Sequence, residues 1–522
     1  MDDKQKFTES INEGYSFKGE SILLGGAIYK SEYLSGVHIK LPLKTMNRHG
    51  LIAGATGTGK TKTLQVIAEG LSSNSIPVLL MDIKGDISGL AQPGITNSKI
   101  EERSQRIGIK YTPKGFPVEL LTISNEKGIR LRATVSEFGP VLFSKILELN
   151  DTQSGLVALI FKYCDDNTLP LLDLKDFKKM LQFISEEGKT EIESAYGKIS
   201  TTSTGTILRK VIELEQQNAD LFFGEMSFEV EDLIKINNEG KGLISIIRLT
   251  DIQDRPKLFS TFLLCLLVEI YNTFPEEGDS DQPKLVIFID EAHLIFQEAS
   301  KALLAQIETI IKLIRSKGVG IFFCTQNPTD IPDSVLSQLG MKVQHALRAF
   351  TAKDRKMIKL IAQNYPMSDY YNLEDLLTSL GIGEAAVTVL SEQGTPTPLA
   401  ATLLCAPASR MDILSPGEIN ELVNKSTLVR KYNETIDRKS AYEILTNKLK
   451  EAHEISEQND SNQEQTNQSG HVKKEKSTVE KVLTSTTARQ VGRTVARELT
   501  RGLLGVLGIG GSSRSRKKSS WF

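Results

Sequence analysis

The stretch GLIAGATGTGKTKTLQV, residues 50–66, decides the fold of this chain of 522 residues. Residues 54–61 carry the pattern Gly-x-x-x-x-Gly-Lys-Thr, the signature of a phosphate-binding loop. The run HGLIAG before the loop is apolar, as in a buried strand, and apolar residues after it follow the helical spacing i, i+3, i+4, i+7 from Leu64 onward. Strand, glycine loop and helix in this order predict a site that binds nucleotide phosphates.

The loop offers chemistry for the phosphates of ATP and for Mg²⁺. Glycines let consecutive backbone N–H groups turn toward phosphate oxygens, and the start of the following helix adds a partial positive charge. We expect Lys60 to reach the β- and γ-phosphates and Thr61 to offer its hydroxyl to Mg²⁺. The predicted nucleotide-binding residues are Gly54, Ala55, Thr56, Gly57, Thr58, Gly59, Lys60, Thr61 and Lys62. The alternative is a glycine-rich turn that only connects a strand to a helix.

A second motif, PKLVIFIDEAH at residues 283–293, ends an apolar strand in two carboxylates. Continuous apolar runs suit parallel strands buried on both faces, and ligands bind at the carboxyl ends of such strands. We expect Asp290 to bind Mg²⁺ through water and Glu291 to be the base that orients a water for attack on the γ-phosphate. Two acidic residues after a strand are equally typical of a solvated loop. Together with the glycine loop, they predict nucleotide hydrolysis.

Two other strand ends carry polar side chains. The run VGIFFCTQNP at residues 319–328 ends in Gln326, whose amide could contact the attacking water or the γ-phosphate. The alternative for this residue is a capping role in the turn before Pro328. The run IPVLLMDIKGD at residues 76–86 includes Asp82, which either lines the nucleotide cleft or caps the next turn.

Short apolar runs separated by helical patterns predict an α/β fold with a mostly parallel sheet. These runs are residues 51–54, 76–82, 118–123, 242–249, 285–290 and 319–324. The 208 positions from Asp82 to Asp290 exceed what simple crossovers need, and helical periodicity within them predicts an α-helical insertion. An insertion of this kind carries partner or substrate recognition in some proteins and serves as a lid in others.

Composition and pattern divide the chain into segments. They are a small N-terminal β element (1–45), the first part of the core (46–135), the α-helical insertion (136–239), the second part of the core (240–410), C-terminal helices (411–454), a polar linker (455–477) and a basic amphipathic tail (478–522). The linker is polar and of low complexity, which is typical of a segment without a packed core.

The formal net charge of −2 hides a strong asymmetry. Residues 470–522 contain twelve Lys and Arg against three Glu, so the end of the chain is basic and the remainder acidic. Arginines recur there every fourth position, opposite a stripe of aliphatic residues, at Arg489, Arg493, Arg497 and Arg501. This pattern predicts binding to a polyanion, DNA first and an anionic membrane surface second. Packing of the aliphatic stripe on the subunit is the alternative.

No secretory signal or membrane span is expected. The first residues, MDDKQKFTES, lack the basic and apolar regions of a signal peptide. The most apolar run, FLLCLLV at residues 262–268, is far shorter than the about 20 residues that cross a bilayer. The cysteines lie far apart without the spacing of a zinc site, so we expect a cytoplasmic protein with buried free thiols at Cys164, Cys265, Cys324 and Cys405.

Several motifs of the chain belong together. They are NRHGLIAGATGTGKT (47–61), DIKGD (82–86), IDEAH (289–293), TQNPTDIPDSVLSQLG (325–340) and LGIGEAAV (380–387). In combination they resemble bacterial ATP-binding proteins with a helicase HerA-like C-terminal domain, which belong to the HerA/FtsK group of RecA-like P-loop motor ATPases. The resemblance covers residues 20–410 and the basic stretch VGRTVARELTRGLLG, and it is far more specific than the phosphate loop alone.

The resemblance implies a RecA-like core and an ATP-hydrolysing motor that assembles as a homo-oligomer, a hexameric ring in the wider group, and acts as a DNA translocase or helicase-like protein. It also implies an arginine that reaches the γ-phosphate of a neighbouring subunit. Arg315, just before the strand that ends in Gln326, is favoured over Arg348 on the next strand. For either arginine, the alternative is an ordinary ion pair at the surface.

Two alternatives share the same core, namely a secretion-type ATPase that moves protein and an ATP-gated switch that is not a motor. The archaeal HerA helicase has a long N-terminal barrel domain, whereas only 45 residues precede the core here. A repair partnership like that of the archaeal helicase is therefore not expected.

Overall fold

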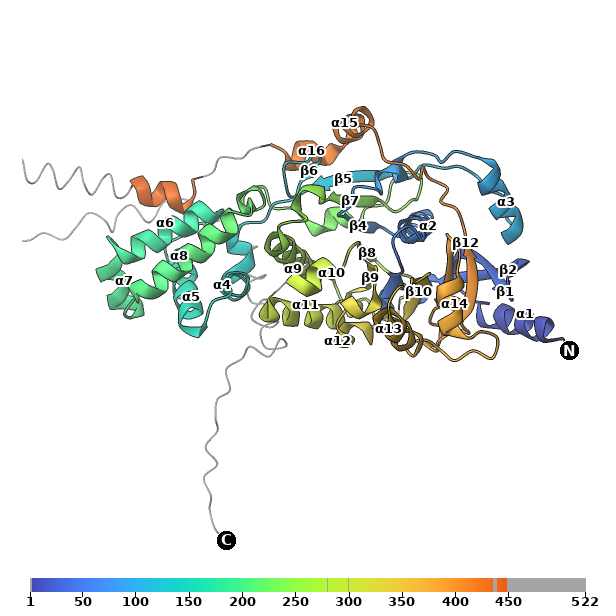
Figure 1. The fold of residues 1–522 in the computed structure, drawn as a ribbon. Coiled ribbons are helices and arrows are strands. Elements are labelled where there is room, and N and C mark those ends of the chain that lie inside the picture. Colours follow the sequence, from blue (N-terminus) through green and yellow to red (C-terminus); the bar gives the residue numbers. More distant parts are fainter. Residues whose placement is uncertain (1, 279, 299, 435–438, 448–522) are drawn as a thin grey trace, which may run out of the picture. The chain divides into compact units, whose positions relative to one another are not determined.

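The computed structural model describes residues 2–278, 280–298, 300–434 and 439–447. Residues 1–441 form one compact unit (Figure 1). The expected polar linker (455–477) and basic tail (478–522) lie outside the described residues.

A sheet of twelve strands, counted over the described part of the chain, forms the centre of the unit (Figure 1). The strands are β1 (Ser21–Tyr29), β2 (Glu32–Pro42), β3 (Gly50–Ala53), β4 (Val78–Asp82), β5 (Val118–Thr122), β6 (Ile129–Arg130), β7 (Ile244–Arg248), β8 (Leu285–Ile289), β9 (Val319–Thr325), β10 (Met341–His345), β11 (Glu384–Thr388) and β12 (Ala400–Leu404). Their order across the sheet is β2-β1-β12-β11-β10-β3-β9-β8-β4-β7-β5-β6. The apolar runs of the sequence correspond to β3, β4, β5, β7, β8 and β9.

The strands from β10 to β6 all run parallel to their neighbours, which confirms the predicted mostly parallel α/β sheet. The remaining strands, β11, β12, β1 and β2, continue the sheet with antiparallel pairing. β4, β8 and β9 are buried along their whole length. Parallel strands that are covered on both faces have such uninterrupted apolar sequences because neither face meets water.

The α-helices lie between the strands in sequence and at both ends of the unit. They are α1 (Asp3–Gly14), α2 (Lys60–Ser73), α3 (Ser98–Ile107), α4 (Val135–Ile146), α5 (Asp151–Asp166), α6 (Leu174–Ser185), α7 (Lys189–Tyr196), α8 (Thr201–Glu215), α9 (Pro256–Thr273), α10 (His293–Glu298), α11 (Lys301–Ile314), α12 (Asp333–Leu336), α13 (Ala352–Ala362), α14 (Leu373–Ser379), α15 (Pro416–Lys425) and α16 (Thr427–Tyr432). In α2 the predicted apolar face is buried, at Leu64, Ile67, Ala68 and Leu71.

Helices cover the sheet on both faces. On one face, Leu64 of α2 packs in one apolar cluster with Ile52 of β3 and Phe322 of β9. The next residue along β9, Phe323, points to the other face, where its ring centroid lies 5.6 Å from that of Phe296 in α10. Since successive residues of a strand point to opposite faces, β9 is enclosed between two helical layers.

The N-terminal residues form part of the main sheet. β1 and β2 make a hairpin, and β1 pairs with β12 so that Gly25 lies opposite Leu404. A Cβ atom on Gly25 would lie 2.1 Å from the carbonyl oxygen of Leu403, so this close approach requires glycine. Helix α1 was not predicted; it is mostly polar, and Phe7 and Ile11 are its buried residues. Two buried residues in three turns give too weak a periodic signal to recognise.

Helices α4 to α8 lie between β6 and β7 in sequence, within the stretch where the sequence indicated an α-helical insertion. Aromatic rings hold them together, with the centroid of Phe143 at 4.8 Å from that of Phe177 and at 6.1 Å from that of Phe161. Leu181 and Ile184 continue the buried face of α6. Contacts of α4 with α9 and α11 join these helices to the core.

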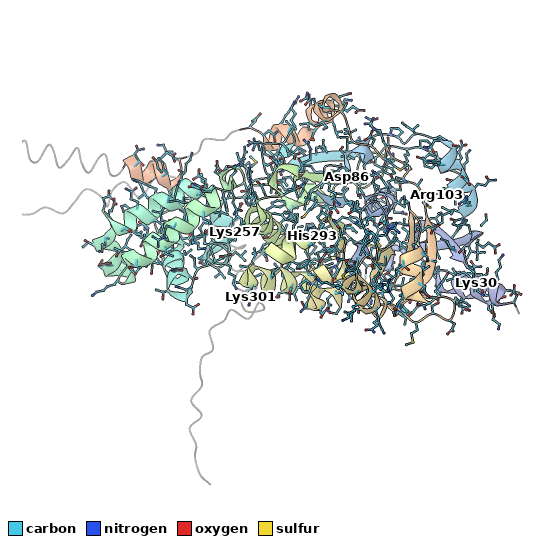
Figure 2. All side chains as sticks on the ribbon, in the orientation of Figure 1. Lys30, Asp86, Arg103, Lys257, His293 and Lys301 are labelled. Atoms are coloured by element: carbon cyan, nitrogen blue, oxygen red, sulfur yellow. The ribbon has the colours of Figure 1, made fainter. Side chains whose placement is uncertain are left out.

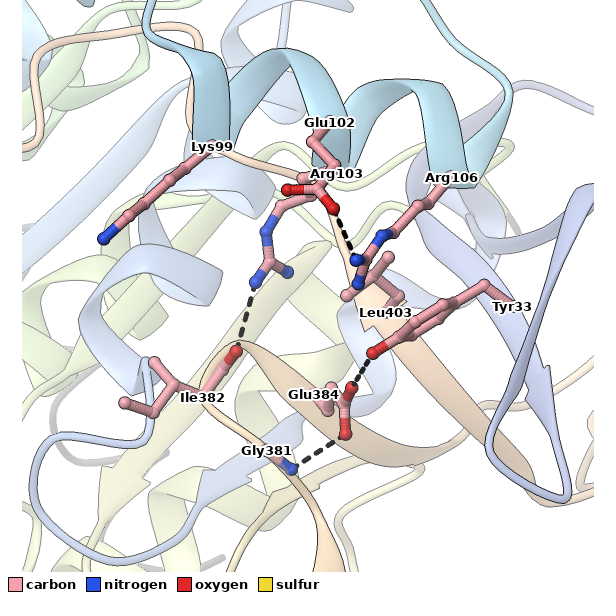
Figure 3. Close-up of a pocket in the computed structure, with 9 residues that line it drawn as sticks. All are labelled: Tyr33, Lys99, Glu102, Arg103, Arg106, Gly381, Ile382, Glu384 and Leu403. Atoms are coloured by element: carbon pink, nitrogen blue, oxygen red, sulfur yellow. Dashed lines mark hydrogen bonds and ion pairs between the residues drawn. The ribbon is translucent and has the colours of Figure 1, made fainter.

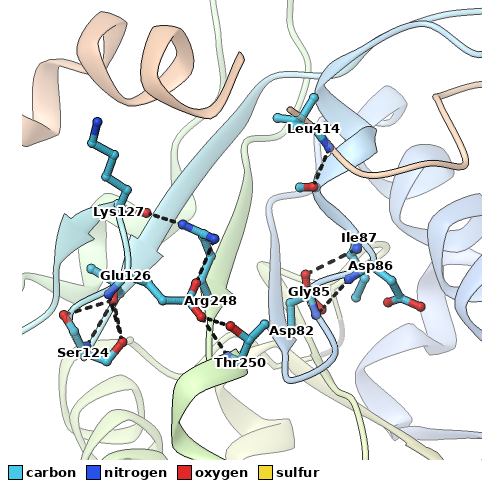
Figure 4. A network of polar contacts seen from close by, with 12 residues as sticks. Asp82, Gly85, Asp86, Ile87, Ser124, Glu126, Lys127, Arg248, Thr250 and Leu414 are labelled. Carbon is cyan, nitrogen blue, oxygen red and sulfur yellow. Dashed lines mark hydrogen bonds and ion pairs between the residues drawn. The ribbon is translucent and has the colours of Figure 1, made fainter. Parts of the chain in front are cut away.

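The turn after β4, residues 83–87, is fixed by one buried carboxylate (Figure 4). Asp82 accepts hydrogen bonds from the backbone N–H groups of Gly85 at 2.7 Å, Asp86 at 3.2 Å and Ile87 at 3.3 Å. Gly85 has a φ of +76°, a left-handed conformation that favours glycine. Of the two roles open for Asp82, the structure shows the capping role. We call this segment the 83–87 turn.

Burial raises the pKa of Asp82 to about 7, and the charge of Asp86 adds to the shift, while the backbone N–H groups oppose it. The pKa in the folded chain therefore lies above the value of about 4 in an unfolded chain. Ionisation of such a group lowers the free energy of unfolding as the pH rises from about 4 through about 7. A difference of about three pKa units lowers the free energy of unfolding by on the order of 4 kcal/mol, and this loss is complete above the pKa of the folded chain.

We expect Asp82→Asn to remove this pH dependence, because an amide oxygen still accepts hydrogen bonds from the turn and does not titrate. The melting temperature of the variant, relative to that of the unaltered chain, should rise between about pH 5 and about pH 8. Asp281→Asn, at a side chain that is 93% exposed, is the matched control and should show no such trend. An equal offset at both pH values for Asp82→Asn would contradict the assignment.

Candidate functional site

Residues 54–59 form the loop between β3 and α2, and three glycines determine its path. Gly54, Gly57 and Gly59 have φ values of +149°, +78° and +110°. A Cβ atom on Gly54 would also lie 2.5 Å from the Cβ atom of His345. Because residues with side chains rarely adopt such φ values, the loop depends on these glycines for its conformation.

The tip of the loop is open to solvent. Thr56 and Gly57 are exposed, and a Cβ atom on Gly57 would meet nothing within 4 Å. Thr58 turns inward instead, where its hydroxyl donates to the carbonyl oxygen of Ala55 at 2.7 Å. The loop therefore has a closed base and an accessible tip, as a surface that receives phosphates requires.

Lys60, the first residue of α2, folds its side chain back into the loop. Its ammonium donates to the carbonyl oxygens of Gly54 at 2.7 Å and Ala55 at 3.2 Å, and the residue is 7% exposed. Burial lowers the pKa of Lys60, and the charge of Lys84 lowers it further, while Glu291 and Asp290 oppose the shift. A positive charge thus lies inside the curve of the loop, where two carbonyl oxygens are its hydrogen-bond partners within the described part of the chain.

The next two residues of α2 contact other segments. Thr61 Oγ1 donates to Asp86 Oδ2 of the 83–87 turn at 3.2 Å. Lys62 Nζ donates to the carbonyl oxygen of Met411 at 2.5 Å. Thr61 therefore faces a carboxylate at the site, whereas the ammonium of Lys62 is directed at the backbone that follows β12.

Asp290 and Glu291 follow β8 at the same sheet edge as the loop, because β8, β9 and β3 run parallel. Each of the two residues is 5% exposed. Burial raises the pKa of Asp290 to about 6; Lys84 opposes this shift and Glu291 adds to it. Glu291 has a φ of +48°, so the backbone turns sharply directly after the strand.

The 83–87 turn connects the two predicted motifs. Lys84 Nζ forms an ion pair with Glu291 Oε1, and Asp86 accepts from the hydroxyl of Thr61. Glu291 Oε2 lies 3.0 Å from Nδ1 of His293, the first residue of α10 (Figure 2 labels Asp86 and His293). No role was predicted for Lys84, Asp86 or His293. Their only signal was a place in DIKGD and IDEAH, directly after buried strands.

Three buried carboxylate oxygens of the site, Asp290 Oδ2, Asp86 Oδ1 and Glu291 Oε2, have no hydrogen-bond partner among the described residues. Buried polar atoms are nearly always paired with protein or with ordered water. Carboxylate and hydroxyl oxygens, together with water, are the ligands that Mg²⁺ prefers. With the ammonium of Lys60 and the N–H groups of the loop, these residues fit the phosphates of a nucleotide bound together with Mg²⁺.

The other predicted residues lie at opposite ends of the parallel strands, either at the edge formed by the carboxyl ends, which carries the loop, or at the edge formed by the amino ends. Gln326 directly follows β9 and is exposed at the edge that carries the loop. Arg348 follows β10 at this same edge and is also exposed. Arg315 is exposed in the short 3₁₀ turn before β9, and therefore at the opposite edge.

The placement of Arg348 on a strand was wrong, because β10 ends at His345. The carbonyl oxygen of Ala346 accepts from the backbone N–H of Ala55 in the phosphate loop at 2.9 Å. This bond takes the chain out of the sheet toward the loop. Arg348 therefore lies in the segment that leaves the strand, two residues beyond a direct backbone contact with the loop.

His345 is a further contact of the loop that the sequence analysis missed. Its Nδ1 lies 3.1 Å from the carbonyl oxygen of Thr58, and its Nε2 lies 2.9 Å from Thr63 Oγ1. Burial lowers the pKa of His345 to about 4, and the charge of Lys60 lowers it further. A neutral imidazole thus connects the end of β10 to the loop and to the first turn of α2.

A cavity of about 340 Å³ lies between α3 and the residues that lead into β11, and Arg103 and Ile382 are among its lining residues (Figure 3). Next to Ile382, the N–H of Gly383 donates to the carbonyl oxygen of Thr58 in the phosphate loop at 2.9 Å. Arg103 of α3 secures this segment by donating to the carbonyl oxygens of Gly383 at 3.0 Å and Leu404 at 2.9 Å. The loop therefore has a rigid, partly basic neighbour on this side.

The described helices include none that is both long and apolar enough to cross a membrane. All four cysteines are free. Cys164 and Cys324 are buried, as expected from their apolar surroundings, whereas Cys265 and Cys405 are only partly covered.

Sequence and structure comparisons agree with the geometry. A family profile described as "Helicase HerA-like C-terminal" matches residues 28–514. The DNA double-strand break repair helicase HerA of Sulfolobus acidocaldarius is 22% identical over 359 residues, which cover 68% of this chain and 64% of that protein. The DNA import protein CedB of the same organism is 24% identical over 357 residues, which cover 67% of this chain and 51% of that protein.

Among solved structures, the plasmid coupling protein TrwB in complex with ADP and Mg²⁺ superposes with a TM-score of 0.50 at 14% identity, covering 78% of this chain and 100% of that one. This likeness confirms the expected RecA-like α/β core. The chain spans 64% of the length of the HerA relative and 51% of that of CedB. Because the family profile extends over most of its residues, the chain belongs to the helicase HerA-like C-terminal family.

Proposed function

We propose that this protein is a cytoplasmic motor ATPase of the HerA/FtsK type, which hydrolyses ATP and uses the free energy to translocate or unwind DNA. One observation carries the proposal: the parallel sheet brings the phosphate loop and two buried carboxylates, Asp290 and Glu291, to one edge. Family membership supports the motor, and relatives named as a DNA repair helicase and a DNA import protein support DNA as the cargo.

Different residues at this edge would bind the phosphates and the Mg²⁺ ion of the nucleotide. The N–H groups of Thr56, Gly57 and Gly59 would bind phosphate oxygens, since those of Gly54, Ala55 and Thr58 donate to backbone carbonyl oxygens. Lys60 would turn its ammonium from the carbonyl groups of its own loop to the β- and γ-phosphates. Thr61 would hold Mg²⁺ directly and Asp290 would hold it through water. When bound, Mg²⁺ neutralises charge on the phosphate oxygens.

Hydrolysis needs a base close to the γ-phosphate. Glu291 would orient a water and accept its proton, the role that the second carboxylate after such a strand fits. β9 lies between β3 and β8, so Gln326 emerges between the loop and the two carboxylates. There its amide would contact the same water or the γ-phosphate.

We expect Lys60→Ala to lose nucleotide binding, because it removes the ammonium that lies inside the loop.

Glu291→Gln should bind ATP but hydrolyse it at least about 100-fold more slowly, the typical value of a positioned base. Binding is measured with a fluorescent nucleotide and hydrolysis by phosphate release. Lys178→Ala, in the ion pair with Glu215 between α6 and α8, is the control and should match the unaltered chain. Hydrolysis at the normal rate by Lys60→Ala would refute the site.

DNA as the cargo predicts that duplex DNA raises the ATPase rate and that the basic tail anchors it. In the full chain, replacing Arg489, Arg493, Arg497 and Arg501 by Ala should weaken DNA binding and flatten its dependence on salt, by a slope of about 0.9 for each lost phosphate contact. The rate without DNA should stay unchanged. Fluorescence anisotropy over a salt series measures both effects. Binding to anionic vesicles but not to DNA would favour the membrane surface, and stimulation by protein alone would favour a secretion-type ATPase.

We further propose a homo-oligomer, a hexameric ring, in which an arginine of one subunit reaches the γ-phosphate bound by the next. β9 has seven residues, which span about 20 Å, and Arg315 and the phosphate loop lie at opposite edges of the sheet. Arg315 is therefore too far from its own loop and can act only on a neighbouring subunit. Arg348 lies at the edge of its own loop, so it can act within its subunit.

Mixing experiments separate these two roles. Subunits with Lys60→Ala and subunits with Arg315→Ala are inactive alone but should regain part of the activity when mixed, because some interfaces then join an intact loop to an intact arginine. The same mixture with Arg348→Ala should stay inactive if Arg348 serves its own subunit. ATPase rate and native mass are measured together. Full activity in a demonstrably monomeric sample would exclude a trans arginine.

A further inference from the structure

We propose that Lys84 is a positioning residue that pairs with Glu291 while no γ-phosphate is bound and moves its ammonium to the γ-phosphate when ATP binds, which frees Glu291 to act on water. The inference rests on the proposed function and adds a residue to it. It also gives the protein a means to distinguish ATP from ADP, since only ATP carries the group that draws Lys84 away.

The backbone of Lys84 lies in a fixed turn, whereas its side chain is partly open to solvent. The carboxylate of Asp82 fixes the 83–87 turn through three N–H groups. From this turn the Lys84 side chain, 35% exposed, reaches over to Glu291, whose side chain is 7% exposed. The lysine has four rotatable side-chain bonds and access to solvent, whereas the carboxylate is enclosed. The ammonium is therefore the partner that can move.

Only one oxygen of Glu291 has a bonded partner among the described residues. Oε1 pairs with Lys84 Nζ, and Oε2 lies 3.0 Å from His293 Nδ1. A base that accepts a proton from water needs a free oxygen within hydrogen-bond reach of that water. Oε2 is buried and has no hydrogen bond to His293 or to any other described residue. The ion pair with Lys84 is therefore the contact that must open before Oε1 can act on water.

When ATP is bound, the γ-phosphate would be a second partner for the Lys84 ammonium. Asp86, in the same turn as Lys84, accepts from Thr61, the residue after Lys60 in the phosphate loop. Lys84 pairs with Glu291 of the second motif, and its charge also acts on Lys60 of the first. A terminal phosphate carries about two negative charges, compared with one on a carboxylate, so it attracts the ammonium more strongly at equal distance.

Binding affinities provide the first test. In the full chain, Lys84→Met should lower the affinity for a non-hydrolysable ATP analogue, adenosine 5′-(β,γ-imido)triphosphate, about 10-fold or more, because a charge-assisted hydrogen bond to the γ-phosphate is lost. The affinity for ADP should stay within about twofold, which also shows that the variant is folded. Lys84→Arg keeps the charge and should retain most of the preference for the ATP analogue. Equal losses for both nucleotides would overturn the proposal.

Turnover provides the second test. Lys84→Met should lower kcat, and in a chain that already carries Glu291→Gln the same change should have much less effect, because the carboxylate that Lys84 positions is absent. Lys178→Met is the matched control, since it removes a Lys–Glu pair of similar exposure, 2.7 Å long, within helices α6 and α8. It should change neither the nucleotide preference nor kcat. Independent, multiplying effects of Lys84→Met and Glu291→Gln would overturn the positioning role.

These outcomes separate the inference from the proposed function. If the unaltered chain binds neither ADP nor the ATP analogue, the proposed function fails. If it binds and hydrolyses ATP while Lys84→Met leaves the ratio of the two affinities unchanged, the proposed function stands and the role of Lys84 fails. Isothermal titration calorimetry of all variants at one salt concentration gives the required ratios.

Discussion

The parallel pairing of β9 with β3 on one side and β8 on the other is the constraint on which the candidate site depends. In this register Ile52 lies beside Cys324, and Ile287 lies beside Ile321. The phosphate loop and the acidic pair therefore leave the sheet at the same level. A slip of β9 by one residue would exchange the faces of Phe322 and its neighbours, so the packing of both helical layers protects the register.

The features that could be predicted from the sequence are those encoded by short, continuous motifs. An apolar run followed by glycines or by carboxylates fits within about ten residues, and such patterns located the loop at residues 54–61 and the strand that ends at Asp290. Lys84 and His345 were missed because their partners, Glu291 and Thr63, lie more than two hundred residues away in the chain. No periodicity records a contact between such distant segments.

The candidate nucleotide site holds several charged side chains that are not all paired with one another. Lys60, Lys84, Asp86, Asp290 and Glu291 lie close enough for their charges to interact. Burying charged groups is unfavourable unless each finds a partner, and the unpaired oxygens of Asp86 and Asp290 show that this balance is incomplete. A ligand that supplies the missing charge should therefore stabilise the folded chain as well as bind to it.

The pairing of β1 with β12 has a consequence for biosynthesis. Gly25 and Leu404 are neighbours in the sheet but stand almost 380 positions apart in the chain. At about 5–20 residues per second, a ribosome needs roughly 20–75 s between the two, during which one edge of the nascent hairpin has no partner strand. Unpaired strand edges invite association with other chains. Early protection by a chaperone, or by the polar helix that precedes the hairpin, is thus a requirement that this topology places on the cell.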